Sequence, residues 1–350
     1  MEFLEIDGSF GEGGGSILRL SSAFSILFQT PVRITNIRAN RSKPGLRLQH
    51  LLGLQTLANL TNSELSKCQV GTQEITLTPK TEEIKNNINV NIRTAASIGL
   101  LLQPVQIMCL GLDPYEINIK LNGGGTYGKW APSVNYLNKV TYNIFERSGL
   151  KMHIDIKKHG FYPKGGARSI CKIQPSQNEL KPINLTKLGK ISHIKGDIIV
   201  TKQLKNKNIP KRIKRSFRKK IHQTLSIESE ISHKYVDSLS AGVGLEVWAK
   251  TDSGAIISSG TIIGEKHISS EQLGKMATDK ITKYIENDIP VDNHLSDQLI
   301  PLMAYTHQPS KIKVLELTSH TETNLKLLKK FIDKDYKVHK LDTGFIIEYL

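Results

Sequence analysis

The chain has 350 residues, enough for two or three domains, and its 38% apolar and 23% charged residues are typical of a globular protein. It contains no run of about 18 apolar residues, which excludes a predicted membrane-spanning helix. The formal charge of +16, from 48 basic and 32 acidic residues, favours a polyanionic partner, although a charged surface that serves only solubility gives the same balance.

The N-terminus predicts an intracellular protein, and the cysteines give no sign of a metal site. Residues 1–5 carry two acids and lack the basic start and apolar run of a signal peptide, so we expect a cytoplasmic location. Cys68, Cys109 and Cys171 are scattered and form no CxxC pair, so neither a zinc site nor a disulfide framework is indicated. No stretch matches an RRM, KH, zinc-finger or homeodomain signature, so nucleic-acid binding has to be argued from a site.

The first 80 residues alternate between strand and helix patterns. Residues 1–65 predict a strand, a glycine-rich turn, a helix, a strand, a loop and a second helix, and residues 66–80 alternate like a strand. A similar order follows: strand 88–92, helix 94–103, strand 105–109, strand 117–121 ending at a Gly123–Gly125 turn, and helix 132–147.

A third copy is predicted for residues 270–350. It would contain helices from Ser270 and from about His294, a strand at 312–315, a helix at 323–331 and a closing hairpin at 337–348. The pattern as a whole predicts repeated β–α–β–α–β–β units of about 80 residues.

Residues 181–270 interrupt this order. Residues 191–200 predict a strand, Asn208 and Pro210 predict a helix start, and residues 243–257 predict a hairpin. The helix has one apolar stripe, Ile209, Ile213, Phe217, Ile221 and Leu225. Its other positions are strongly basic and either follow an RNA backbone or form an ordinary solvated face. The predicted fold is therefore α/β (α+β), with a large domain of three repeated units (1–180 and 271–350) and a small inserted α/β domain (181–270).

The glycine-rich segment at residues 11–15 places backbone amides at a helix N-terminus, where an anion is favoured. Glu12 would repel phosphate there unless it holds a divalent cation that the phosphates share; the alternative is a tight turn with an exposed glutamate. A second glycine-rich segment, residues 123–129, is not a P-loop, because Trp130 replaces the hydroxyl residue that binds magnesium.

Several cationic and imidazole side chains are candidates for phosphate chemistry. Arg38 and Arg41 in a Pro-Gly loop suit bidentate phosphate recognition, and Arg19 lies one helical turn past the glycines; each alone would be read as a surface arginine. His294 and Asp297 are predicted to share one face of a helix, at a spacing that metal ligands can use. The alternative is that they belong to the N-terminal cap of that helix. His320 is predicted to lie in a polar turn and is the best candidate for a nucleophile, since neutral imidazole forms a P–N bond that breaks readily in the next step.

Six motifs, taken together, resemble the RNA 3'-terminal phosphate cyclase family. They are GEGGG (11–15), IRANRSKPGL (37–46), LLQ (101–103), HGFYPKGG (159–166), HLSDQL (294–299) and SHTETN (319–324), in the family's order along nearly the whole chain. The resemblance implies a large domain of repeated α/β units, with a small domain inserted before the last unit. It also implies a ligase that uses ATP and a divalent metal, Mg or Mn, and acts on RNA with a 3'-phosphate end.

In that family a histidine attacks the α-phosphate of ATP and carries AMP, which passes to the RNA 3'-phosphate; the vicinal 2'-hydroxyl then closes a 2',3'-cyclic phosphate. The resemblance implies the nucleophile at His320 and the metal ligand at Glu12. It implies phosphate-binding and catalytic arginines at Arg19, Arg38 and Arg41. The remaining matches are to the nucleotide and RNA-end site: Gly13, Gly14, Gln49, Gln103, Pro132, His294, Asp297 and Gln298, with Pro132 and His294 flanking the adenine.

Departures from the family pattern occur at residues 93–97, at Ala167 and at Tyr127, where an acid is common. They spare the predicted nucleophile and arginines, so activity is expected to survive. The main alternative is a cyclase-like, non-catalytic RNA-binding protein of ribosome biogenesis, against which His320 argues. A second alternative is a plain RNA-binding protein that uses its basic insert. No feature of the sequence specifies an oligomeric state.

Overall fold

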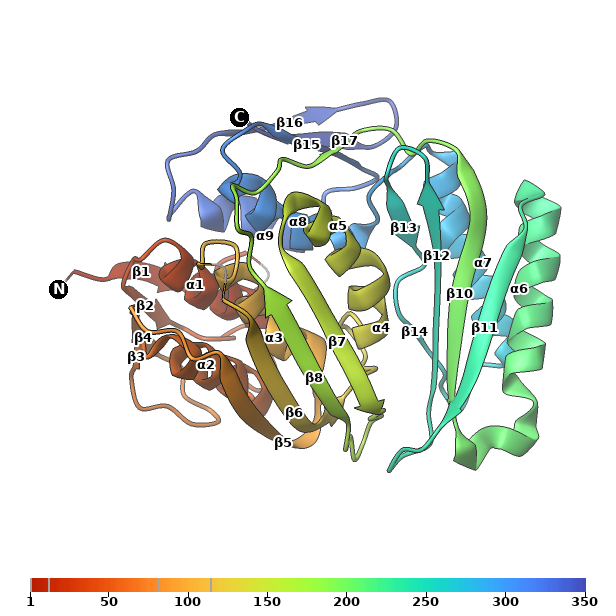
Figure 1. Cartoon of the computed structure of the whole chain (residues 1–350), viewed down its shortest axis with the longest axis horizontal. Coiled ribbons are helices and arrows are strands. Elements are labelled where there is room, and N and C mark those ends of the chain that lie inside the picture. Colours follow the sequence, from red (N-terminus) through yellow and green to blue (C-terminus); the bar gives the residue numbers. More distant parts are fainter. Residues whose placement is uncertain (1, 12, 81, 114) are drawn as a thin grey trace.

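The structure is a computed structural model that describes residues 2–11, 13–80, 82–113 and 115–350 (Figure 1). The helices are α1 (Gly15–Leu27), α2 (Leu48–Thr61), α3 (Ile98–Met108), α4 (Val134–Tyr136), the π-helix η1 (Leu137–Thr141), α5 (Tyr142–Ser148), the 3-10 helix η2 (Lys202–Lys207), α6 (Ile209–Leu225), α7 (Ser270–Glu286), α8 (Asn293–Tyr305) and α9 (Ser319–Leu328). The strands are β1 (Leu4–Asp7), β2 (Val32–Thr35), β3 (Glu64–Leu65), β4 (Ile75–Thr78), β5 (Asn87–Ser97), β6 (Ile117–Gly125), β7 (Lys151–Lys158), β8 (Arg168–Gln174), β9 (Asn184–Leu185), β10 (Ile191–Thr201), β11 (Ser229–Val236), β12 (Val243–Thr251), β13 (Ile256–Ser258), β14 (Ile262–Ile263), β15 (Ser310–Val314), β16 (Tyr336–Lys340) and β17 (Phe345–Tyr349).

Three four-stranded sheets among the described residues share one topology. The first has the order β1-β2-β4-β3, the second β5-β6-β8-β7 and the third β9-β15-β17-β16. In each sheet the first pair is parallel and the other two pairs are antiparallel. A parallel pair requires a crossover, which a helix supplies in every unit. The predicted α/β (α+β) fold with repeated β–α–β–α–β–β units is confirmed.

The third unit begins earlier than predicted. Strand β9 pairs in parallel with β15, through Lys311 opposite Asn184 and Ile312 opposite Leu185, so β9 is the first strand of that unit. The inserted elements β10 to α7 therefore lie inside the third unit, between its first strand and its first helix α8. The expectation that the insertion precedes the unit, and that the helix from Ser270 belongs to the repeat, was wrong.

The second unit also corrects two predicted elements. Residues 105–109 were predicted as a strand, but α3 continues to Met108, because Val105 and Ile107 are buried on a helix that is apolar nearly all round. The predicted Gly123–Gly125 turn is the end of strand β6. The predicted helix at 132–147 is present as α4, η1 and α5 in succession.

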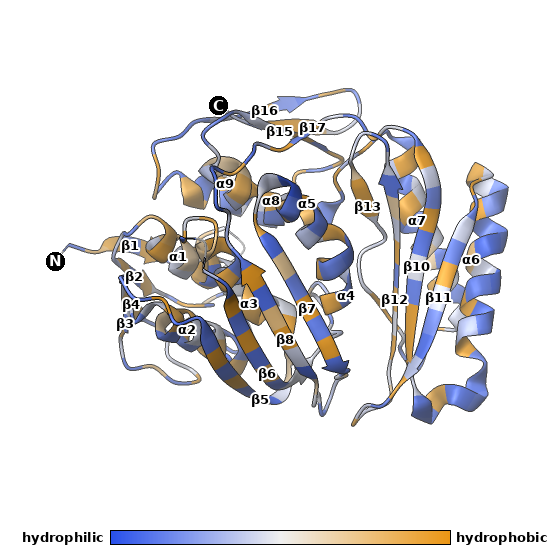
Figure 2. Ribbon diagram, in the orientation of Figure 1, coloured by the Kyte–Doolittle hydropathy of each residue, from blue (hydrophilic) through white to orange (hydrophobic). Residues whose placement is uncertain are grey.

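The inserted elements form their own sheet, of order β11-β10-β12-β13 with β14 on β12, at one end of the molecule (Figure 1). Helix α6 is largely hydrophilic (Figure 2), and its predicted stripe is confirmed, since Ile209, Ile213, Phe217 and Ile221 are buried. Helix α7 packs on α6 at Gly274, where a Cβ would lie 2.7 Å from the Ile213 carbonyl oxygen. The division into domains stays a prediction, and this packing favours an inserted domain that extends through α7.

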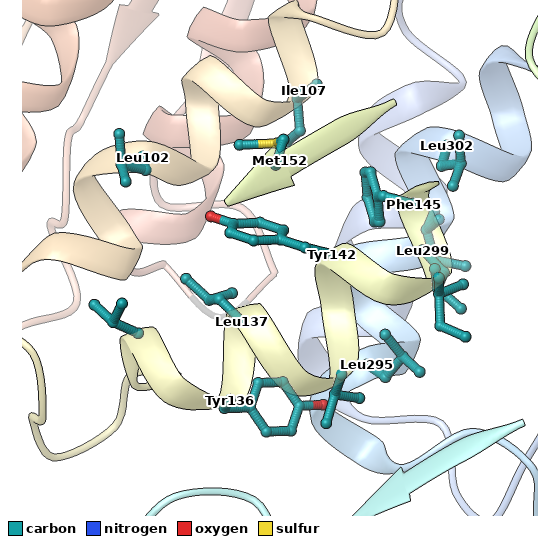
Figure 3. Close-up of a cluster of buried hydrophobic side chains, with 14 of the residues drawn as sticks. Leu102, Ile107, Tyr136, Leu137, Tyr142, Phe145, Met152, Leu295, Leu299 and Leu302 are labelled. Carbon is teal, nitrogen blue, oxygen red and sulfur yellow. The ribbon is translucent and has the colours of Figure 1, made fainter. Parts of the chain in front are cut away.

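The helices of the second and third units share an apolar core (Figure 3). Tyr142 and Phe145 of α5 lie between α3, represented by Leu102, and α8, represented by Leu299. All of these side chains are at most 2% exposed. Burial on this scale is the main favourable term in folding, so the two units are held together by apolar packing. No helix in the described part of the chain is long and apolar enough to cross a membrane.

A smaller apolar cluster joins the second unit to the inserted sheet. Tyr127 is 2% exposed and stacks on Phe161 with ring centroids 5.3 Å apart. It also covers Gly244 of β12, where a Cβ would lie 2.2 Å from the tyrosine ring. Tyr127 therefore contributes to packing between the second unit and the inserted sheet.

We predict that Tyr127→Ala lowers the free energy of unfolding by about 3–5 kcal/mol, because a buried ring is lost. The Tyr127 hydroxyl has no hydrogen-bond partner among the described residues. Tyr127→Phe should therefore be neutral or stabilising by up to about 1 kcal/mol. Urea denaturation of the two variants measures both effects, and equal losses of stability would contradict this account of the ring.

Candidate active site

A cavity of about 540 Å³ lies where the three units and the inserted elements meet. Its wall is formed by α1, α3, α4 and α8, by the first turn of α9, and by α7 and β14 of the insertion. This volume is within the usual range of about 300–1,000 Å³ for small-molecule sites. Seven predicted site residues line it: Arg19, Gln103, Pro132, His294, Asp297, Gln298 and His320.

His320 lies in the first turn of α9 and not in a polar turn as predicted. Thr318 caps this helix, and its hydroxyl oxygen accepts a hydrogen bond from the Thr321 amide at 3.0 Å. His320 is half-buried and faces the cavity. Because the first amides of a helix favour negative charge, a nucleophile at this end of α9 would meet phosphate in a favourable field.

The glycine-rich turn lies directly beside α9 and beside the loop between β2 and α2. This loop contains Arg38 and Arg41 and is called the arginine loop below. Gly11 and Gly13 both have φ of +58°, which favours glycine. A Cβ on Gly11 would lie 2.5 Å from the Thr323 hydroxyl oxygen, and one on Gly13 would meet the Asn40 amide. The turn, the loop after β2 and α9 are thus brought together, and Gly14 occupies the N-cap of α1. Glu12 lies outside the described residues.

Arg19 and Asp297 set the electrostatics of one wall. The Arg19 guanidinium donates to the Gln103 side-chain oxygen at 2.8 Å. Burial raises the pKa of Asp297 to about 7, although Arg19 opposes this rise and Asp292 adds to it. A carboxyl group with this pKa is partly protonated at neutral pH and can then donate a hydrogen bond.

Arg38, Arg41 and Gln49 do not line the cavity. The Arg38 guanidinium donates to the carbonyl oxygens of Lys43 and Gly45, at 2.7 and 2.9 Å, and so holds the loop in shape. Burial, with Arg47 and Arg41, lowers the pKa of Arg38. Arg41 is exposed, and Gln49 is half-buried in the first turn of α2.

Buried His50 connects this loop to Arg19. Burial lowers the pKa of His50 to about 3, and the charges of Arg19, Arg38 and Arg47 add to the effect. A neutral histidine therefore sits among three guanidinium groups. The arginine loop is next to Arg19, although it is not part of the cavity wall.

His294 lies one turn before Asp297 on α8 and also lines the cavity. Gly260, with φ of +65°, packs behind the ring, and a Cβ there would lie 2.5 Å from a ring carbon of His294. Burial lowers the pKa of His294, and Lys280 and His320 add to this. The helix cap is Asp292, which accepts from the amides of His294 and Leu295 at 3.0 and 3.1 Å. The predicted pair of His294 and Asp297 is thus not the cap.

Sequence reasoning missed the contribution of the inserted elements. Lys280 of α7 lines the cavity, and burial lowers its pKa while Asp292 opposes this. At the mouth, Lys129 pairs with Glu265 at 2.7 Å, next to Trp130, which is 95% exposed. No local motif marks Lys280 or Glu265, because they reach the site only through the packing of the insertion. Among the described residues no group of three or more His, Cys, Asp or Glu side chains could hold a metal ion.

Comparison with known proteins agrees with the motif-based resemblance. The model of the family described as RNA 3'-terminal phosphate cyclase matches residues 10–338. A Thermococcus kodakarensis protein of that name is 36% identical over 97% of this chain and 95% of its own length. A Methanosarcina barkeri protein of the same name is 35% identical over 98% of both chains. A third, from Pyrobaculum aerophilum, is 34% identical over 99% of this chain and 97% of its own.

We predict that Asp297→Asn stabilises the protein in a pH-dependent way. The folded-state pKa is about 7 against an ordinary 3.8, so ionisation destabilises the fold increasingly from about pH 4 to pH 7 and fully above that. The variant should match the wild type near pH 4 and exceed its free energy of unfolding by roughly 2–4 kcal/mol at pH 8. Denaturant titrations at both pH values measure this difference. The exposed Asp333→Asn is the control, and a pH-independent effect of Asp297→Asn would contradict the prediction.

Proposed function

The chain belongs to the RNA 3'-terminal phosphate cyclase family, and we propose that it converts an RNA 3'-phosphate to a 2',3'-cyclic phosphate by an ATP-dependent reaction through a histidine–AMP intermediate. The observation that carries this proposal is the position of His320. It lies in the first turn of α9 and shares one cavity with Arg19, Gln103 and the two residues predicted to flank adenine.

The first step would be attack of an imidazole nitrogen of His320 on the α-phosphorus of ATP. A P–N bond forms, the bond to the bridging oxygen breaks, and pyrophosphate leaves. In the second step an oxygen of the RNA 3'-phosphate attacks the same phosphorus, and the imidazole leaves. The RNA then ends in a phosphoanhydride to AMP.

In the third step the vicinal 2'-hydroxyl attacks the 3'-phosphorus, loses its proton, and expels AMP. Adenylylation is needed because a phosphate monoester has no leaving group better than oxide. The last attack is intramolecular, and such proximity is worth up to about 7–11 kcal/mol in general. The chemistry also selects RNA over DNA, which lacks the 2'-hydroxyl.

The remaining residues have proposed roles in binding and charge neutralisation. Arg19, Arg38 and Arg41 would neutralise the phosphates in each displacement. Pro132 and His294 would hold adenine, and Asp297, Gln298, Gln103 and Gln49 would bind polar groups of the nucleotide and RNA end. Lys280 is a further basic residue that lines the same cavity.

Three expectations stay predictions. One is that Glu12 holds a divalent cation that accompanies ATP, the second is that Gly13 and Gly14 approach the nucleotide, and the third is the cytoplasmic location. A divalent cation would supply charge neutralisation at the phosphates. The packing of Gly11 and Gly13 against neighbouring segments supports a preformed turn at this place.

We predict that the wild type, incubated with α-labelled ATP and a divalent metal, acquires a label that is acid-labile and alkali-stable. His320→Ala should lose this label completely, because no other side chain would accept the adenylyl group. His307→Ala is the matched control, since His307 is an exposed histidine just beyond α8 and should leave labelling unchanged. Denaturing electrophoresis measures the label.

Two results would count against the proposal. Label that persists in His320→Ala would show a different nucleophile. An unlabelled wild type that still binds RNA would favour the non-catalytic, cyclase-like alternative. Formation of phosphatase-resistant ends on an RNA with a 3'-phosphate tests the complete reaction.

A further inference from the structure

A second cavity, of about 450 Å³, lies between the inserted sheet and the second unit. It shares no lining residue with the cavity around His320. We define the basic cavity by its four basic lining residues: Lys139 of η1, His193 and Lys195 of β10, and Lys250 of β12. All four are exposed, and its described lining contains no carboxylate.

The cations of the basic cavity lie close enough to repel one another. Burial lowers the pKa of Lys250, and the charges of Arg147, Lys139 and Lys195 lower it further, while Glu146 opposes them. Of the carboxylates near these lysines, Glu230 is 4.0 Å from the Lys195 ammonium and is itself exposed. Several ammonium groups around one cavity produce a positive electrostatic potential, which a bound anion would neutralise.

The walls of the basic cavity are held in place by hydrogen bonds and by an aromatic floor. Asn138 donates to the Ile154 carbonyl oxygen at 2.8 Å and accepts from the Ile154 amide at 2.9 Å, which ties η1 to β7. Trp248 is 6% exposed, and the Lys139 ammonium lies 5.4 Å from its ring centroid. A preformed wall of this kind reduces the entropy lost on binding.

The π-helix η1 connects the two cavities. Leu137 lines the cavity around His320, and Asn138 and Lys139 line the basic cavity, so consecutive residues of one helical turn contribute to both. π-helical turns often occur at functional sites.

We propose that the basic cavity is a subsite for backbone phosphates of the RNA strand, outside the reacting 3' end. The identification of the polyanion as RNA rests on the proposed function. The basic cavity is a stronger candidate than the basic helix α6. Two of the cations on that helix are already paired with α7, Arg212 with Glu271 and Lys220 with Asp279. Phosphate contacts bind any sequence and set affinity and its salt dependence.

The test is direct binding of a short, labelled single-stranded RNA that ends in a 3'-hydroxyl, in the absence of ATP, measured by fluorescence anisotropy over a range of salt concentrations. Lys139→Gln/Lys250→Gln should bind about tenfold more weakly at about 0.1 M salt, and its log–log salt slope should be shallower by about 1.4, as expected for two lost contacts to a single strand. Lys67→Gln/Lys120→Gln, which removes two exposed lysines of the first two units, is the matched control and should bind like the wild type.

Three outcomes would overturn the subsite. The first is unchanged affinity of the cavity variant, and the second is an equal loss of affinity in the control pair. The third is a loss of affinity for RNA but not for DNA of the same sequence, because phosphate contacts are common to both. Labelling with α-labelled ATP separates this proposal from the proposed function. The cavity variant should label like the wild type, and loss of both its label and its RNA affinity would also overturn the subsite. A wild type that takes no label but shows the cavity-dependent affinity would refute the proposed function and retain the subsite.

Discussion

The candidate site depends on a close approach that only glycine permits. A Cβ on Gly15 would lie 2.2 Å from a ring nitrogen of His50, just as Gly11 has no room beside Thr323 and Gly13 none beside Asn40. Because the three glycines have no side chain, the start of α1, the arginine loop and α9 can meet. More than 300 residues separate the start of α1 from α9. The position of His320 relative to Arg19 follows from this contact, and so does the cationic surrounding of His50.

The repeated topology explains how a long insertion is accommodated. Each unit pairs its first two strands in parallel, and such a pair already requires a crossover connection. In the third unit the connection after β9 contains the whole inserted sheet before α8 begins. Its two ends are joined to each other, and its start is also joined to the turn between β12 and β13. The Lys190 amide donates to Asp252 at 2.8 Å, and the Leu188 amide donates to Asp288 at 3.1 Å. Since the cost of closing a loop grows slowly with its length, an insertion tied at its base is tolerated.

Sequence patterns predicted the parts of the molecule that have a strong period or a specific motif. The stripe on α6, the hairpins and the first unit follow from apolar spacing, and the motif containing His294 and Asp297 predicted one wall of the cavity. Three features could not be predicted in this way. Strand β9 has two residues and no detectable period, α3 is buried on nearly all sides and so resembles a strand in its second half, and Lys280 reaches the cavity from α7 only through tertiary packing. Arg38 stays a predicted phosphate ligand; its observed hydrogen bonds to loop carbonyl oxygens are a feature that sequence spacing does not reveal.

Buried Glu246 shows how the inserted sheet is coupled to the wall that contains Pro132. Its carboxylate accepts hydrogen bonds from Ser133 and from Thr261, the latter at 3.0 Å. Ser133 caps α4, and its amide donates to Thr261 at 2.9 Å, so one carboxylate of β12 fixes the start of the helix that follows Pro132. Burial raises the pKa of Glu246 to about 7, against the effect of its hydrogen bonds. Separating a buried carboxylate from its hydrogen-bond donors costs free energy, because the carboxylate and the donors would each be left without a partner. Movement of the inserted sheet away from the second unit would therefore disturb the wall beside Pro132 as well.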